Sequence, residues 1–145
     1  MPRNSPRPYV AEPPAHYRVR PPLIVDCSVV AALLFDEPQR DEALAVMSEA
    51  RLFAPFLLDT EMVSVALRKS RLGLADAASL GLADYRAMPI ERHEVELAEQ
   101  MRIALDHGLT AYDAAYLALA AKLRAPLATF DQKLARAAER HLGSL

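Results

Sequence analysis

The chain has 145 residues, of which 52% are hydrophobic and 25% are charged, and its formal net charge is −2. This balance is typical of a single globular domain and excludes both a disordered chain and a basic protein that coats nucleic acid. The sequence contains no apolar stretch long enough for a membrane helix and no signal-peptide core behind its first basic residues. The single cysteine, Cys27, fits a reducing, cytoplasmic environment.

Residues 1–22 differ in composition from the rest of the chain. They hold seven of the eleven prolines and a local charge of +3, whereas residues 23–145 carry −5. Because proline lacks an amide donor and resists helix and sheet, we expect a flexible or polyproline-like tail here. A tail packed on the domain or a partner, and a start codon assigned too far upstream, are alternatives. We expect one folded domain over residues 23–145.

In chain order, the apolar periodicity predicts short strands that alternate with helices. The expected elements are a strand at 23–25, helices at 29–35 and 40–50, a strand at 52–56, a helix to about 72, helices at 75–88 and 92–106 around a short strand at 88–90, a helix at 110–123, a strand at 126–130 and a last helix from 131. Asp59 or Thr60 is expected to cap the helix that stops at Gly73. This alternation predicts an α/β fold in which helices cover both faces of a small parallel sheet.

Four acidic residues stand out because of their positions relative to these elements. Asp26 and Asp131 directly follow predicted strands, and Glu61 and Asp113 lie in the first turn of predicted helices. In an open parallel sheet, the carboxyl ends of the strands and the N-termini of the connecting helices share one edge, where ligand sites form. The topology therefore predicts that all four carboxylates reach the same edge of the sheet.

Each of these residues also has a purely structural explanation. Asp113 completes a capping box with Thr110, Asp26 suits a helix cap, and the other two suit the positive end of a helix dipole. Four carboxylates that face each other repel, however, and a divalent cation removes that repulsion. Oxygen ligands without a His or Cys cluster favour Mg²⁺ or Mn²⁺ over zinc. Because the sequence has no glycine-rich phosphate loop, such a metal suggests hydrolysis of a phosphodiester bond.

The segments around the four acidic residues resemble the motifs of PIN domains, and most closely those of VapC-type toxins of bacterial toxin–antitoxin pairs. The resemblance rests on residues 25–33, 58–67, 109–119 and 127–137 and spans the chain from 23 to about 138. The third segment, Leu-Thr-Ala-Tyr-Asp-Ala-Ala-Tyr-Leu-Ala-Leu, is the most specific match. Every acidic position of the pattern is present, whereas the proline-rich tail has no counterpart in it.

The resemblance implies a Mg²⁺-dependent endoribonuclease, with Mn²⁺ as an alternative metal. Asp26 and Asp113 correspond to the main metal ligands, and Glu61 and Asp131 complete the acidic catalytic pocket through water or a second metal. Ser28 and Thr129 match positions that support this site by hydrogen bonding. Three basic residues near the end of the Glu61 helix are candidates for RNA contacts, with a solvated helix end as the alternative: Arg68, Lys69 and Arg71.

The resemblance also implies partners. These are the RNA substrate, a cognate VapB-like antitoxin and a second copy of the chain in a homodimer. Tyr112 and Tyr116, which flank Asp113, are expected to pack in the core rather than to stack on bases. The apolar residues that either serve a partner or belong to the core are Val30, Leu33, Leu34 and Val63.

Three other functions compete with the toxin hypothesis. A PIN nuclease of RNA processing would share the site, and an open reading frame for an antitoxin immediately upstream would distinguish the two. A binding module on the same fold is expected to have lost acidic positions, which this chain has not. A phosphatase of the haloacid dehalogenase type needs Asp-x-Asp after its first strand, whereas this chain has Asp26-Cys-Ser28.

Overall fold

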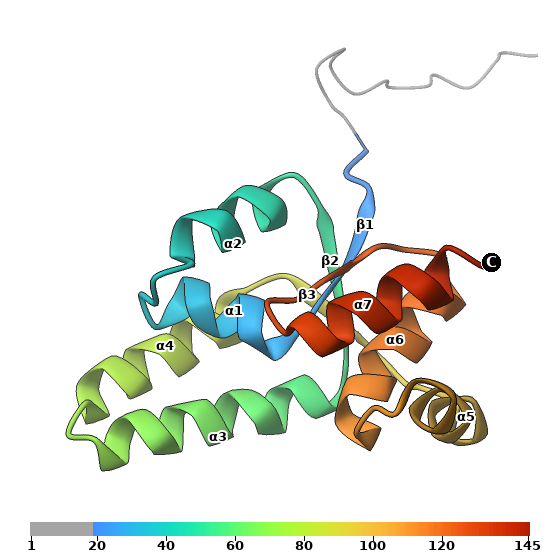
Figure 1. Cartoon of the computed structure of the whole chain (residues 1–145). Helices are drawn as coiled ribbons and strands as arrows, with labels where there is room; N and C mark the ends of the chain where they lie inside the picture. Colours follow the sequence, from blue (N-terminus) through green and yellow to red (C-terminus); the bar gives the residue numbers. More distant parts are fainter. Residues whose placement is uncertain (1–18) are drawn as a thin grey trace, which may run out of the picture.

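The computed structural model describes residues 19–145, which form four strands and seven helices (Figure 1). In chain order these are β1 (Pro22–Val25), α1 (Cys27–Leu34), α2 (Arg40–Ser48), β2 (Arg51–Pro55), α3 (Leu57–Arg71), α4 (Ala75–Ala87), β3 (Ile90–His93), α5 (Leu97–His107), α6 (Ala111–Leu123), β4 (Leu127–Ala128) and α7 (Gln132–Leu142). Of the tail predicted over residues 1–22, residues 1–18 lie outside the described residues. None of the helices within residues 19–145 is long and apolar enough to cross a membrane.

The strands form one parallel sheet in the order β3-β2-β1-β4, which confirms the predicted α/β fold. The chain moves outward from β1 to β2 and β3, and then crosses back past β1 to add β4. In Figure 1, α1 to α4 lie on one side of the strands and α5 to α7 on the other. The connections therefore change direction between β1 and β4, and ligands of open parallel sheets bind outside the carboxyl ends of the strands at such a point.

The core lies where α6 packs on β1 and β2. Residues 23–25 of β1 are all buried, as expected for a central strand that helices cover on both faces. Residues 114–120 of α6 are buried as well. Each fully buried leucine, such as Leu117 or Leu119, contributes roughly 1.5–3 kcal/mol of hydrophobic free energy. Asp113 therefore lies in the first turn of a helix that the core holds in place.

The prediction for the segment before α5 is wrong. The expected helix at 92–106 begins only at Leu97, and the short strand expected at 88–90 is found slightly later, as Ile90–His93 of β3. This strand lies at the edge of the sheet, where one face is open to polar side chains. Its charged residues have partners there, since the Glu91 carboxylate lies 2.7 Å from Arg51. An edge strand of this kind lacks the apolar run by which buried strands are predicted.

The predicted start of α3 is also wrong. The helix begins at Leu57, with Phe56 as its N-cap after β2 ends at Pro55, rather than after a cap at Asp59 or Thr60. Glu61 consequently lies in the second turn of α3 and not in the first. Its distance from the N-terminus of the helix rules out the simple dipole explanation, because that effect falls off within the first turn.

Candidate active site

Asp26 is the only charged side chain within residues 19–145 that the fold buries, with 6% of its surface exposed. It directly follows β1, and its backbone N–H donates to the carbonyl of Ala128 in β4 at 3.1 Å. Its Oδ2 atom accepts hydrogen bonds from Ser28 Oγ at 2.8 Å and from Thr129 Oγ1 at 2.7 Å. Oδ1 accepts none from the described residues, yet it is not sealed from solvent. The fold thus holds one oxygen of this carboxylate and leaves the other available.

The two hydroxyls that hold Asp26 also join the ends of β1 and β4. Ser28 Oγ accepts from the backbone N–H of Phe130, and Thr129 Oγ1 accepts from that of Asp131, both at 3.0 Å. Asp26 makes no side-chain capping bond to α1, so the helix-cap explanation fails for this residue. Ser28 and Thr129 therefore orient a buried charge that has no structural task of its own in α1.

Glu61 and Tyr116 connect α3 to α6. The Tyr116 hydroxyl donates to Glu61 Oε1 at 2.7 Å, and the tyrosine ring is fully buried. Partial burial raises the pKa of Glu61, and the negative charges of Asp26 and Asp113 raise it further, whereas the hydrogen bond from Tyr116 lowers it. The structure thus brings Asp26 and Asp113 close enough to Glu61 for their charges to raise its pKa.

Asp113 lies in the first turn of α6, where its backbone N–H donates to Thr110 Oγ1 at 3.1 Å. Burial raises the pKa of Asp113, as do the charges of Asp26 and Asp131, while the ammonium group of Lys133 lowers it. Asp131 is exposed and caps α7, because its Oδ1 accepts from the backbone N–H of Leu134 at 2.8 Å. Asp131 therefore belongs to the cluster but also has a structural role.

The four residues form what we call the carboxylate edge: Asp26, Glu61, Asp113 and Asp131. None of them takes part in a salt bridge within residues 19–145. Nor does this part of the chain contain three or more His, Cys, Asp or Glu side chains arranged to enclose a metal ion by themselves. Mg²⁺ is compatible with such an arrangement, because it usually keeps several waters and binds through one or two carboxylates. The all-oxygen donor set fits this ion.

A cleft of about 660 Å³ lies beside Glu61, and Arg68 and Tyr112 form part of its wall. Both side chains are exposed, Tyr112 to 65%. The prediction that Tyr112 packs in the core is therefore wrong, whereas the same prediction for Tyr116 is correct. The hydroxyl contact of Tyr116 escaped the sequence analysis, although a buried tyrosine usually signals a hydrogen-bond partner.

The other polar residues near the cleft differ in whether they are available to react with or bind a ligand. Cys27 also lines the cleft, but burial and the charges of Glu61 and Asp26 raise the pKa of its thiol to about 12. It is therefore a protonated thiol and no nucleophile at neutral pH. Lys69 lies 3.5 Å from the Glu37 carboxylate and over the Phe35 ring. Of the three basic candidates for RNA contacts, only Arg68 borders the cleft.

The comparisons with known proteins identify the family of the chain. A family model of the PIN domain matches residues 23–140. Ribonuclease VapC3 of Pyrobaculum aerophilum is 35% identical, over 78% of this chain and 92% of that protein. Ribonuclease VapC9 of Mycobacterium tuberculosis is 33% identical, over 77% and 87%. The crystal structure of PAE2754 from Pyrobaculum aerophilum superposes with a TM-score of 0.66 at 27% identity, covering 86% of this chain and 95% of that one.

These matches show that the chain belongs to the PIN-domain family. Within the family, the curated relatives are VapC ribonucleases, so the resemblance to VapC-type proteins that the four motifs indicated is confirmed.

Proposed function

We propose that this protein is a cytoplasmic endoribonuclease of the VapC type, the toxin of a toxin–antitoxin pair, which hydrolyses RNA at the carboxylate edge. One observation carries the assignment. Asp26 is buried without a basic partner among the described residues, is oriented by two hydroxyls, and lies near two further carboxylates. Burying such a charge is costly unless a ligand compensates it. A divalent cation, Mg²⁺ or alternatively Mn²⁺, is the ligand that suits this donor set.

In this proposal, the residues of the carboxylate edge have different roles. Asp26 and Asp113 would hold the metal, while Glu61 and Asp131 would bind it through water or hold a second ion. When bound, the ion supplies activation of water and stabilisation of charge on the phosphate oxygens. Ser28 and Thr129 keep the Asp26 carboxylate in one orientation.

Arg68 is the residue that we propose as the first phosphate contact outside the edge. It lines the same cleft as Glu61 and is exposed, so an RNA strand at the edge reaches it. Lys69 is engaged with Glu37, and Arg71 is the last residue of α3. A guanidinium binds phosphate oxygens in a bidentate manner, which positions the strand without reading its sequence.

The proposal includes two protein partners, a VapB-like antitoxin and a second copy of the chain. Val30, one of the candidate residues for a partner surface, is fully buried and belongs to the core. Val63 is 47% exposed, and Leu67, one turn further along α3, is 48% exposed. An apolar surface for a partner is therefore available on α3 but not at Val30.

The test is cleavage of total RNA by the purified, antitoxin-free protein in the presence of Mg²⁺. We expect discrete products that disappear with EDTA and in the Asp26→Asn and Asp113→Asn variants, while circular dichroism shows both variants folded. Asp106→Asn on α5 is the matched control, because its carboxylate pairs with Arg102 and should be dispensable for cleavage. Cleavage that persists in both edge variants would refute the assignment. Absence of cleavage by the wild type with Mg²⁺ and Mn²⁺ on a range of RNAs would count strongly against it.

A further inference from the structure

We propose that Tyr116 is the positioning residue for Glu61: its phenol holds one carboxylate oxygen so that the other serves the metal or its water. This inference rests on the proposed function. It is carried by the contact itself, a hydrogen bond of 2.7 Å between residues 55 positions apart in the sequence. No other described residue donates a hydrogen bond to the Glu61 carboxylate.

The position of Tyr116 makes the contact rigid. The residue follows Asp113 by three positions on α6, so both side chains project from the same face of the helix. The ring has no exposed surface and lies within the buried stretch of α6. A ring packed in this way cannot swing, so its oxygen acts as a fixed point for a carboxylate on another helix. One helix thus places Asp113 directly and Glu61 through Tyr116.

The chemistry of a phenol suits this task better than that of a cation. A tyrosine hydroxyl has a single O–H donor, so it occupies Oε1 and leaves Oε2 unengaged. It is neutral at physiological pH, so it orients the carboxylate without cancelling the charge that attracts a metal. Lysine or arginine at this position would form an ion pair and neutralise the edge.

Asp26 is held in the same manner as Glu61, by hydroxyl groups that donate to one of its two carboxylate oxygens. Ser28 and Thr129 both donate to Oδ2 and leave Oδ1 unengaged by the described residues. Hydroxyl groups alone therefore orient these two carboxylates, each through one oxygen. Groups that orient metal-binding side chains typically contribute roughly 10- to 100-fold to metal affinity or activity.

A purely structural role for Tyr116 makes a different prediction. A buried tyrosine needs a hydrogen-bond partner in any case, so its loss lowers stability wherever it lies. Tyr85 provides the matched control, because it is also buried and its hydroxyl donates to a carboxylate, Asp59 Oδ1, at 2.6 Å. Tyr85→Phe and Tyr116→Phe should lower the melting temperature to a similar extent. Only the second should affect the site.

The experiment is a double-mutant cycle with Tyr116→Phe and Glu61→Gln, which keeps an acceptor for the phenol but removes the charge. Calorimetric Mn²⁺ titration and RNA cleavage are measured for wild type, both single variants, the double variant and Tyr85→Phe. We expect Tyr116→Phe to lose roughly 10- to 100-fold in Mn²⁺ affinity or cleavage rate. In the Glu61→Gln background the same change should cost less than about twofold, the error within which independent effects add.

The outcomes separate the inference from the proposed function. If the wild type binds Mn²⁺ and cleaves RNA while Tyr116→Phe matches it within twofold, or if the two effects multiply, the positioning role is wrong and the proposed function stands. The positioning role is equally wrong if Tyr85→Phe reduces Mn²⁺ affinity as much as Tyr116→Phe. A wild type that neither binds Mn²⁺ nor cleaves RNA overturns both.

Discussion

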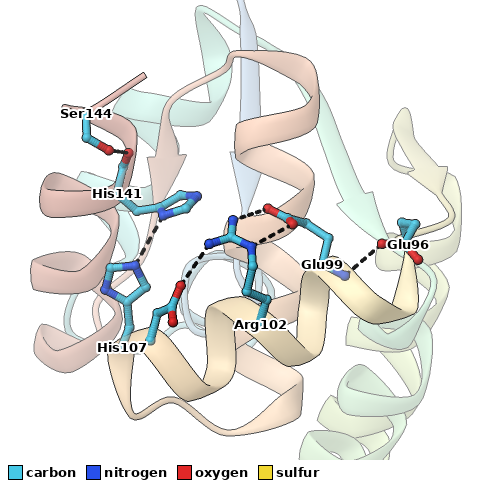
Figure 2. A network of polar contacts seen from close by, with 7 residues as sticks. Glu96, Glu99, Arg102, His107, His141 and Ser144 are labelled. Carbon is cyan, nitrogen blue, oxygen red and sulfur yellow. Dashed lines mark hydrogen bonds and ion pairs between the residues drawn. The ribbon is translucent and has the colours of Figure 1, made fainter.

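Two polar clusters of this protein differ in whether their charged side chains form ion pairs. The α5–α7 network consists of Glu99, Arg102, Asp106, His107 and His141, and Figure 2 labels all of these except Asp106. Arg102 binds Glu99 at 2.5 Å and Asp106 at 2.8 Å, and His107 Nε2 lies 3.2 Å from His141 Nδ1. Every carboxylate of this network has a cation beside it. At the carboxylate edge, by contrast, hydroxyls and backbone amides are the partners and no salt bridge is formed among the described residues.

This contrast separates acidic residues that need no ligand from those that do. Exposed ion pairs such as those of Arg102 add little to stability because solvent screens them, and they need no further ligand. Like charges without a counter-ion oppose folding instead. The pKa values of Glu61 and Asp113 are raised first by burial and then by the charges of the neighbouring carboxylates. In the proposed function, the cation that binds at the carboxylate edge compensates this repulsion. Four predictions test this contrast, the largest expected effect first.

The largest effect is expected from the hydroxyl that holds Asp26. Thr129→Val keeps the shape of the side chain but removes the donor to Asp26 Oδ2. We expect a loss of roughly 10- to 100-fold in cleavage rate at fixed Mg²⁺. Ser144→Ala, which removes a hydroxyl bonded to the His141 carbonyl beside the α5–α7 network, should leave the rate unchanged. Equal effects of the two substitutions would erase the distinction between the clusters.

The second prediction concerns the stability of the metal-free protein. Because the pKa of Glu61 is raised on folding, the folded state holds a proton more tightly than the unfolded chain, whose value is near 4.5. Stability is therefore lost as pH rises from about 4.5 through the raised value.

Glu61→Gln removes this penalty, so the variant should melt a few degrees higher than the wild type in EDTA at pH 7. In a domain of this size, 1 kcal/mol corresponds to roughly 2–4 °C. Mn²⁺ should then raise the melting temperature of the wild type more than that of the variant. Differential scanning calorimetry measures both quantities. A variant that melts lower in EDTA would mean that the edge is not repulsive.

A third, smaller effect is expected on the other side of the comparison. Arg102→Ala removes both ion pairs of the α5–α7 network, which are half exposed. Urea denaturation should show only a small loss of stability, because solvent screens exposed ion pairs, and RNA cleavage should be unaffected. A cleavage defect in this variant would show that the network is part of the functional site.

The smallest effect is a pH dependence at His141. Burial lowers the pKa of His141, and the neighbouring His107 and Arg102 lower it further, against the opposing charges of Glu99 and Asp106. The unfolded chain therefore takes up a proton near pH 6.5 while the folded protein does not, so stability falls as pH drops below about 6.5. His141→Gln should flatten the melting temperature between pH 7 and 5.5. If the melting temperature of the variant depends on pH as strongly as that of the wild type, another group causes the pH dependence.

Local patterns in the sequence mark three of the four acidic residues of the carboxylate edge. Asp26 and Asp131 follow strands, and Asp113 lies in a capping segment after Thr110, so their shared edge follows from strand direction alone. The contact between Tyr116 and Glu61 is not predictable in this way. It depends on how α3 and α6 approach each other across 55 residues of chain, which no local periodicity encodes.

The errors in the predicted elements have a related cause. In β3, only Ile90 of the four residues is buried, so the strand is held by its pairing with β2 rather than by a hydrophobic pattern. Tyr112 was misplaced because it precedes the buried stretch of α6 by two residues, and helix periodicity alone does not show where burial begins. Both features are set by neighbours distant in the sequence.

The most direct test of the contrast between the two clusters is anomalous diffraction from crystals soaked in Mn²⁺. We predict an anomalous peak between Asp26 and Asp113, and none beside Glu99 or Asp106 in the α5–α7 network. Asp26→Asn crystals soaked in the same way should lack the peak. Well-ordered crystals without a peak at the carboxylate edge, or with the ion at the α5–α7 network instead, would contradict the assignment of the edge as the metal-binding active site.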